Sequence, residues 1–238
     1  MVDVVQVLPP LVSSELANIP AAPESTLPPT ASLPEDVPPA PWRCTFHGVM
    51  WFQRAGVRAA ALLPAPLRPA TPRLLIGAHL RYTDTPVGSY SEVFAAVVVR
   101  VGARPGAHLP FMAVDSVGSV RGGRANWAIP KTTARFSGDP VGGQALEASG
   151  AGWSIRTRAR ALGPAFPLTL HLRQAQVWPD GTVARSSVTI SGRARAALAD
   201  VSTYSEHQLA SWMPPGRHVG LLWQEATLAL TPATGRPG

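Results

Sequence analysis

From residue 42 onward, the chain follows mainly the alternation of apolar and polar positions that is typical of β-strands. The Val97-Val98-Val99 run indicates a strand that is buried on both faces. Val57 to Leu63 has the pattern of a short helix that ends at Pro64, and Asp180-Gly181 is typical of a hairpin turn. The predicted strands and apolar runs are Thr45 to Arg54, Leu74 to Tyr82, Tyr90 to Val101, Phe111 to Val117, Trp153 to Arg160, Leu168 to Val177, Thr182 to Gly192 and Leu221 to Leu230.

Residues 1–41 have a different character, because they are rich in Pro, Ala, Ser and Thr and show no sustained periodicity. A segment of this kind does not pair its backbone regularly. We therefore expect residues 1–41 to be an extended or disordered N-terminal extension, and residues 42–238 to form one domain. The pattern places this domain in the α+β class, mainly β, with a few short helices.

The composition sets limits on the class of protein. With 238 residues and 45% apolar residues, the chain can bury a sizeable core. No stretch of 18 uninterrupted apolar residues is present, and residues 1–10 contain no basic residue. We therefore expect neither a membrane span nor a secretory signal, and we predict a cytoplasmic protein. Cys44 is the single cysteine, which excludes an intramolecular disulfide and a cysteine-based zinc site.

The net charge of +7 first suggests a nucleic-acid partner. However, the arginines are scattered, and the densest group, Arg156, Arg158 and Arg160, alternates along a predicted strand, where it is expected to form one solvated face. We predict no nucleic-acid partner. The six histidines lack the spacing of metal ligands, and Gly118 to Gly123 lacks the strand–GxGxxG–helix context of a dinucleotide site. We therefore expect neither a metal nor a cofactor.

The most informative feature is that twenty arginines accompany a single lysine, Lys131. A guanidinium stays protonated, whereas burial favours the neutral form of an amine, which is a nucleophile. Trp127 and Ile129 supply apolar surface close to Lys131, and Pro130 restricts the backbone just before it. A neutral amine can condense with a ketone to an iminium, which accepts the electrons of a breaking carbon–carbon bond. The alternative is that Lys131 is an ordinary surface lysine.

The residues around Lys131 resemble a known signature. Gly123-Arg124 followed by Pro130-Lys131 is similar to the lysine motif of the acetoacetate decarboxylase family. Tyr90-Ser91-Glu92 resembles the Tyr-x-Glu element of that family, and Glu92 lies 39 positions before Lys131, as the family would have it. The resemblance extends over residues 42–232. Its other elements are Phe46-His47, the stretch from Leu63 to Leu67, and the segment from Trp212 to Ala229.

This resemblance implies a closed, cone-shaped antiparallel β-sheet around the lysine. It implies that Lys131 forms a Schiff base, that Glu92 is the acidic group of the cavity, and that Arg124, Tyr90 and Trp127 contact the substrate. The implied activity is the decarboxylation of a small β-keto acid such as acetoacetate by a homo-oligomer. Other roles are open for these residues. Glu92 could face solvent at a strand edge, Tyr90 could pack in the core, and Trp127 could form the pocket wall or part of the core. Arg124 could hold the loop by pairing with a carboxylate.

Two departures from the family pattern leave the reaction type open. Thr132 stands where the decarboxylating members have a second lysine, and Val49 is found where an arginine is expected near the substrate carboxylate. An aldolase or dehydratase that uses the same lysine on pyruvate-like keto acids is therefore one alternative. A non-catalytic protein that binds a small carbonyl ligand is another. The sequence does not define the keto acid or the number of subunits.

Overall fold

The computed structural model describes residues 16–27, 31–68, 72, 74–101, 104–139 and 144–235. Strands make up most of this part of the chain. In chain order, the elements are η1 (Pro23–Ser25), β1 (Trp42–Arg54), α2 (Val57–Ala61), η2 (Ala65–Leu67), β2 (Leu74–Asp84), β3 (Tyr90–Val101), β4 (Arg104–Val114), α3 (Val117–Trp127), β5 (Lys131–Thr133), β6 (Arg135–Ser137), β7 (Leu146–Gly150), β8 (Trp153–Val177), β9 (Val183–Ser205), α4 (Leu209–Trp212) and β10 (Gly216–Leu230).

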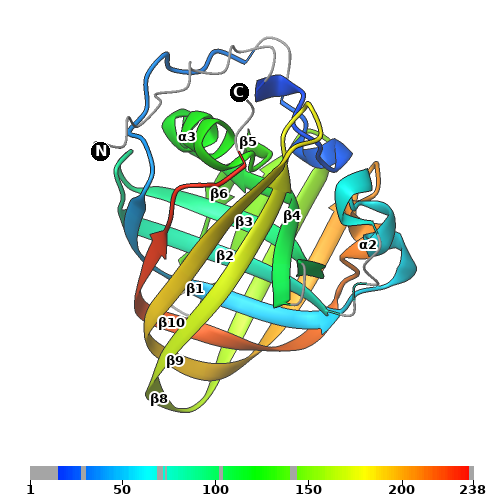
Figure 1. Cartoon of the computed structure of the whole chain (residues 1–238). Helices are drawn as coiled ribbons and strands as arrows, with labels where there is room; N and C mark the ends of the chain where they lie inside the picture. Colours follow the sequence, from blue (N-terminus) through cyan, green and yellow to red (C-terminus); the bar gives the residue numbers. More distant parts are fainter. Residues whose placement is uncertain are drawn as a thin grey trace.

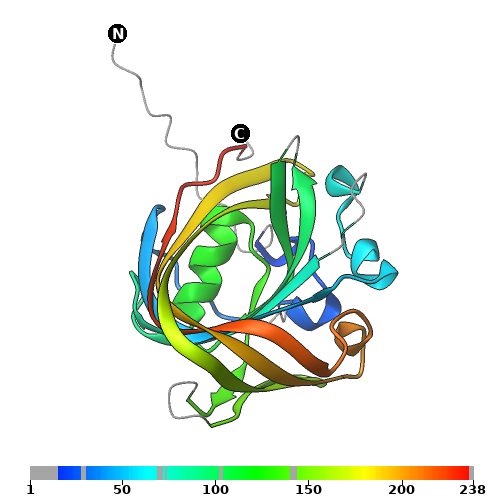
Figure 2. The ribbon, with the colours of Figure 1, turned by 90° about the horizontal axis from the view of Figure 1, so that it is seen from below.

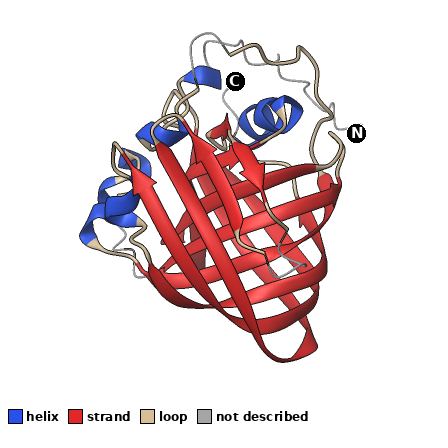
Figure 3. Ribbon diagram, turned by 180° about the vertical axis from the view of Figure 1, so that it is seen from behind, coloured by secondary structure: helices blue, strands red, loops and turns tan. Residues whose placement is uncertain are grey.

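The strands form one sheet in the order β5-β4-β3-β2-β1-β10-β9-β8-β7-β6. Neighbours pair antiparallel, except for the parallel pair β4–β5. A parallel contact between Ala107 of β4 and Gln174 of β8 joins two distant strands and closes the sheet. Figures 1 and 3 show the resulting cone, with α3 at its wide end, and Figure 2 shows α3 framed by the curved strands. The predicted class, α+β and mainly β with a cone-shaped sheet, is confirmed.

Side chains from the two faces of the sheet enter two separate cores, because successive residues of a strand point in opposite directions. On β1, Cys44 and Met50 belong to the core that contains Trp127, whereas Trp51 packs in the core around Trp153. On β3, Val97 lies in the second of these cores and Val98 packs against the first. The Val97-Val98-Val99 run therefore lies in a strand covered on both faces, as its sequence predicts.

The strands and the first helix agree with the sequence pattern in type and differ in length. β3 has the predicted bounds, α2 begins at Val57 as expected, and the hairpin turn at Asp180-Gly181 is confirmed by a bond from Trp178 N to Thr182 O of 2.9 Å. The two strands predicted on either side of residue 164 are one element, β8, because its pairing with β9 shifts register between Leu162 and Phe166 and then continues.

The glycine-rich stretch lies inside α3. The helix begins after Ser116, whose hydroxyl accepts a hydrogen bond from Ser119 N at 3.2 Å, as an N-cap does. It ends at Ala128, which has a left-handed φ of 53°. The apolar run from Phe111 therefore divides between the end of β4 and the start of this helix.

The expectation of a disordered extension is wrong for residues 16–27. Leu16 and Ser25 are fully buried, and Ser25 Oγ donates to Pro130 O at 2.6 Å and accepts from Met112 N at 2.9 Å. The buried Glu24 carboxylate accepts backbone bonds of 2.7 and 2.6 Å at the start of α4. The Pro-rich composition of this segment gave no indication that Leu16, Glu24 and Ser25 contact the rest of the domain. Residues 1–15 and 28–30 lie outside the described part, and the domain boundary at residue 42 stays a prediction.

Candidate active site

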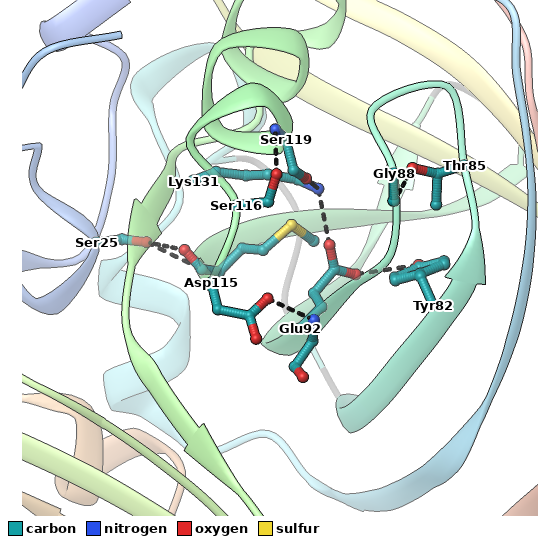
Figure 4. Close-up of polar contacts among 11 residues, drawn as sticks. Ser25, Tyr82, Thr85, Gly88, Glu92, Asp115, Ser116, Ser119 and Lys131 are labelled. Atoms are coloured by element: carbon teal, nitrogen blue, oxygen red, sulfur yellow. Dashed lines mark hydrogen bonds and ion pairs between the residues drawn. The ribbon is translucent and has the colours of Figure 1, made fainter.

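The single lysine lies in a buried cluster of polar side chains. Lys131 Nζ is 2.7 Å from Glu92 Oε2 and donates to Ser119 Oγ at 2.9 Å (Figure 4). It is also 5.2 Å from the centroid of the Tyr90 ring. Lys131 is 5% exposed and Glu92 2% exposed. The structure thus brings together the two residues that the sequence singled out. It contradicts a surface lysine and a solvent-facing Glu92.

The backbone around Lys131 is fixed by the end of α3. Ile129 N donates to Gly123 O at 3.1 Å, and Lys131 N donates to Ile129 O at 2.8 Å across Pro130. Gly123 also makes room for the lysine side chain: a Cβ there would lie 2.7 Å from Lys131 Cδ and 2.8 Å from Cε. The absence of a side chain at Gly123 therefore lets the amine lie along the helix and reach Glu92.

Two tyrosines flank the Glu92 carboxylate. Tyr82 donates its hydroxyl to Glu92 Oε1 at 3.2 Å, and the Tyr82 and Tyr90 rings lie 4.7 Å apart. Burial, and then the nearby Glu92 carboxylate, raises the pKa of both phenols well above the usual value. Tyr82 and Tyr90 therefore stay protonated, and they can donate hydrogen bonds but do not act as bases near neutral pH.

Lys131 and Glu92 face a cavity of about 110 Å³, which we call the chamber. Burial raises the pKa of the Cys44 thiol in its wall to about 12, so this thiol is not a competing nucleophile. Sixteen of the lining residues are apolar: Trp42, Met50, Ile76, Leu80, Phe94, Ala96, Ala107, Leu109, Met112, Trp127, Ile129, Leu172, Val188, Ile190, Leu228 and Leu230. The others are Cys44, Tyr82, Tyr90, Glu92, Lys131, Arg173 and Gln174.

Arg124 is placed differently from the substrate-contacting role predicted for it. Its side chain is fully buried and is not among the residues that line the chamber. Its guanidinium donates to the carbonyl oxygens of Lys131 at 2.6 Å, Leu16 at 2.5 Å and Ser25 at 3.0 Å. Burial lowers its pKa to about 10, so it remains charged at neutral pH. The structure thus places Arg124 outside the chamber wall, where its guanidinium holds three backbone carbonyls in place, and the predicted substrate contact stays a prediction.

The other two predicted contact residues do line the chamber. The Tyr90 ring lies beside the amine, as described above. Trp127 forms part of the wall: its Nε1 donates to Thr231 O at 2.7 Å and its ring meets the Trp42 ring edge-on at 5.2 Å. Since its only polar atom is directed at a backbone carbonyl, Trp127 offers a ligand an apolar surface.

The two positions that depart from the family pattern face away from the chamber. The Thr132 hydroxyl donates to Thr26 O at 3.3 Å, and Val49 is fully buried in the core on the other face of the sheet. On β1, the neighbouring Met50 lines the chamber instead. Position 49 of this chain therefore points to the opposite face of β1 from the chamber, because successive side chains of a strand alternate between its two faces.

Ser119, Tyr82 and Gln174 are site residues that the sequence did not reveal. Ser119 and Gly123 are four residues apart and share one face of a helix, a relation that is visible only when the glycine-rich stretch is taken as helical. Gln174 lies in the chamber wall, and its amide nitrogen is buried without a protein partner within the described residues. It offers one neutral hydrogen-bond donor to a ligand.

The histidines of the described residues do not line the chamber. Across the described ranges, no group of three or more His, Cys, Asp or Glu side chains is arranged to hold a metal ion. His79 and His108 are buried singly, and burial lowers their pKa values to about 3 and about 4. The amine of Lys131 and the carboxylate of Glu92 line the chamber beside the hydroxyls of Tyr82 and Tyr90.

Comparison with known proteins identifies the acetoacetate decarboxylase family. The family model described as acetoacetate decarboxylase (ADC) matches residues 22–154. Acetoacetate decarboxylase from Legionella pneumophila subsp. pneumophila str. Philadelphia 1 is similar in structure, with 16% identity, a TM-score of 0.62 and coverage of 88% of this chain and 92% of that chain. An acetoacetate decarboxylase-like enzyme from Sphingomonas wittichii RW1 has 16% identity, a TM-score of 0.63 and coverage of 85% and 95%.

A third similar structure is the enduracididine biosynthesis enzyme MppR, complexed with the condensation product of pyruvate and imidazole 4-carboxaldehyde. It has 16% identity and a TM-score of 0.60, and the match covers 87% of this chain and 98% of that chain. No curated protein sequence matches the chain. At these identities the structural neighbours establish a shared fold.

Proposed function

Because this chain belongs to the acetoacetate decarboxylase family, we propose that it is a Schiff-base-forming lyase that decarboxylates a small β-keto acid, such as acetoacetate, through Lys131. One observation carries the proposal: the only amine side chain of the protein is buried at an apolar chamber, 2.7 Å from a buried carboxylate. Such a pair provides a nucleophile and an acid–base group at one carbonyl carbon.

The Lys131–Glu92 pair can supply a neutral amine. The two groups are joined by a hydrogen bond along which one proton can move. When the proton lies on the amine, two opposite charges are held in apolar surroundings, which costs free energy. When it lies on the carboxylate, the site contains a neutral amine and a neutral carboxylic acid. The proposed reaction uses this second state, in which Nζ has a free electron pair for attack.

The proposed reaction uses each group in turn. The Nζ electron pair adds to the ketone carbon, and the hydroxyl of the adduct leaves as water with a proton from Glu92. The bond between the α-carbon and the carboxylate then breaks, and its electron pair converts the iminium into an enamine as carbon dioxide leaves. A proton that is ultimately supplied by solvent adds to the enamine carbon. Water then hydrolyses the iminium, which releases a methyl ketone and regenerates the amine.

The surroundings favour the bond-breaking step. Before it, the substrate carries an iminium cation and a carboxylate anion; after it, the products are an uncharged enamine and carbon dioxide. Loss of both charges is more favourable at an apolar wall than in water, since water stabilises the separated charges. Ser119 Oγ, which accepts a hydrogen bond from Nζ, keeps the amine directed at the chamber.

A second candidate reaction has a specific observation in its favour. A structural neighbour, MppR, has been seen with a condensation product of pyruvate, and the second lysine of the decarboxylating members is Thr132 here. An aldolase or dehydratase would form the same iminium on a pyruvate-like keto acid and use the enamine as a carbon nucleophile. It would not release carbon dioxide.

Reductive trapping separates these possibilities. The protein is incubated with acetoacetate or with pyruvate, sodium borohydride is added, and the intact mass and the released carbon dioxide are measured. A decarboxylase gives an adduct from acetoacetate together with gas, whereas an aldolase or dehydratase gives a pyruvate adduct without gas. The Lys131→Arg variant keeps a hydrogen-bond donor beside Glu92 and removes the nucleophile, so it should give no adduct. Failure of wild-type protein to form any adduct would refute the Schiff-base proposal.

Assembly and location complete the proposal. We expect a homo-oligomer, as the resemblance to the acetoacetate decarboxylase family implies. A cytoplasmic location is expected with a small keto acid as substrate. Within the described residues, every helix is too short or too polar to cross a lipid bilayer.

A further inference from the structure

The side chains that line the chamber indicate which groups the substrate carries besides its carbonyl group. We propose that the substrate is a β-keto acid with an extended apolar chain or ring on the far side of the carbonyl from the carboxylate. This inference rests on the proposed function, because it takes Lys131 as the point of attachment. The sixteen apolar lining residues and the length of the chamber are the observations that support it.

The chamber is longer than a four-carbon substrate requires. Along β3 its wall continues from Glu92 through Phe94 to Ala96, which is about 13–14 Å at a rise of roughly 3.4 Å per residue. The carbon skeleton of acetoacetate spans at most about 4.5 Å, at roughly 1.5 Å per bond. With its carbonyl carbon at Lys131, a four-carbon acid leaves most of this wall uncovered.

The far part of the chamber presents apolar side chains that are partly open to solvent. Phe94, Leu172 and Val188 all line it and are only half-buried, and Leu172 and Val188 are cross-strand neighbours on β8 and β9. Apolar surface of this kind gains free energy when a ligand removes it from water. A chain that extends from Lys131 along β3 would cover these side chains.

The charge distribution argues against a second charged group on the substrate. Among the described lining residues, only Lys131 and Arg173 are basic, and Arg173 is exposed, on the opposite face of β8 from Leu172 and Gln174. The Arg124 guanidinium is occupied by three backbone carbonyls. Gln174 adds a neutral donor. An additional carboxylate in the far part of the chamber would be buried without a counter-charge, which is strongly unfavourable.

A series of methyl ketones tests the inference without requiring decarboxylation. Acetone, 2-butanone, 2-pentanone and 2-heptanone are trapped on the wild-type protein with borohydride, and the ketone concentration that gives half-maximal adduct is read from intact mass. Each buried methylene should strengthen binding about fourfold. From acetone to 2-heptanone, which adds four methylenes, the half-maximal concentration should therefore fall roughly 100-fold or more. The same order is expected for decarboxylation, with 3-oxooctanoate preferred over acetoacetate.

Two matched variants on β8 locate the binding of the chain. Leu172→Gln places an amide in the chamber wall and should reduce the ratio of the acetone to the 2-heptanone half-maximal concentrations at least about fivefold. Leu162→Gln makes the same change on the same strand at an exposed residue that does not line the chamber, and should leave the ratio unchanged. The ratio compares two ligands on one protein, so a loss of folded protein lowers both signals and does not imitate the effect.

The outcomes distinguish this inference from the function on which it rests. Tightening along the series, weakened by Leu172→Gln, supports an apolar-chain substrate. If acetone and acetoacetate form adducts but the ratio stays within about threefold, the substrate inference is overturned and the Schiff-base function stands. If no ketone gives an adduct at any length, both fail.

Discussion

The glycine that lies against the nucleophile provides a sharp test of the site. A Cβ at Gly123 would lie 2.7, 2.8 and 3.0 Å from Cδ, Cε and Cγ of Lys131. These atoms belong to a flexible side chain, so Gly123→Ala can be accommodated by moving the lysine. The helix itself gains up to about 1 kcal/mol from replacement of an internal glycine, which offsets part of an overpacking cost of about 1–3 kcal/mol. We expect the thermal midpoint to change by only a few degrees.

The effect on chemistry should be much larger. Displacing Nζ by about 1 Å breaks its geometry with Glu92 and Ser119, and a misplacement of this size costs about 100-fold in rate. The assay is the rate of borohydride trapping with acetoacetate, measured beside a thermal melt. Gly118→Ala, in the first turn of the same helix, is the matched control, because its Cβ would meet Val87 only at 3.3 Å and lies away from Lys131. Trapping by Gly123→Ala at the wild-type rate would refute the role given to this glycine.

Three further predictions concern stability. Arg124→Met removes three charged hydrogen bonds and leaves buried carbonyls unpaired, so chemical denaturation should show a loss of about 3–5 kcal/mol; a loss below 1 kcal/mol would contradict its positioning role. Burial lowers the pKa values of His79 and His108 in the folded protein, so the unfolded chain binds more protons below pH 6.5. The contribution of each neutral histidine to the free energy of unfolding is complete above that pH and should fall by about 2 kcal/mol between pH 7 and pH 5. In His79→Leu, about half of this dependence of unfolding free energy on pH should be lost. Deletion of residues 1–27 removes the Ser25 and Glu24 contacts and should destabilise the protein by more than about 5 kcal/mol in the same chemical denaturation assay. An unchanged denaturation midpoint would show that these residues do not contribute to the stability of the fold.

The sequence was most informative where a regular period or an unusual composition pointed to one interpretation. The alternation along residues 90–101 predicted β3 with its observed bounds, and the solitary Lys131 in an arginine-rich chain marked the centre of the site. Its relation to Glu92 could be inferred only from the resemblance to a family, because the pairing of β2, β3 and β4 that brings the carboxylate to the amine depends on contacts between distant segments.

What the sequence concealed depended on tertiary contacts that override local preference. The glycine-rich stretch has low helix propensity, yet it forms α3 because Gly122 and Gly123 allow Trp42 and Lys131 to pack closely against the helix. The sequence predicted that Arg124 contacts the substrate. The structure instead pairs its guanidinium with the carbonyls of Leu16 and Ser25, which lie more than 90 positions away in the sequence, and no local pattern indicates such a contact. The Pro-rich start of the chain likewise concealed its anchors in the core.

The central claim is that Lys131 carries the covalent intermediate, and the chain offers an unusually direct measurement of it. Trypsin cleaves after arginine and unmodified lysine, so a trapped adduct should appear in the peptide of residues 125–135, where it blocks cleavage after Lys131. The peptide of residues 1–43 contains no lysine and serves as an internal control. After incubation with acetoacetate and borohydride, we expect the added mass on the peptide of residues 125–135 alone. An adduct on the peptide of residues 1–43 alone, or on neither peptide, would contradict the assignment.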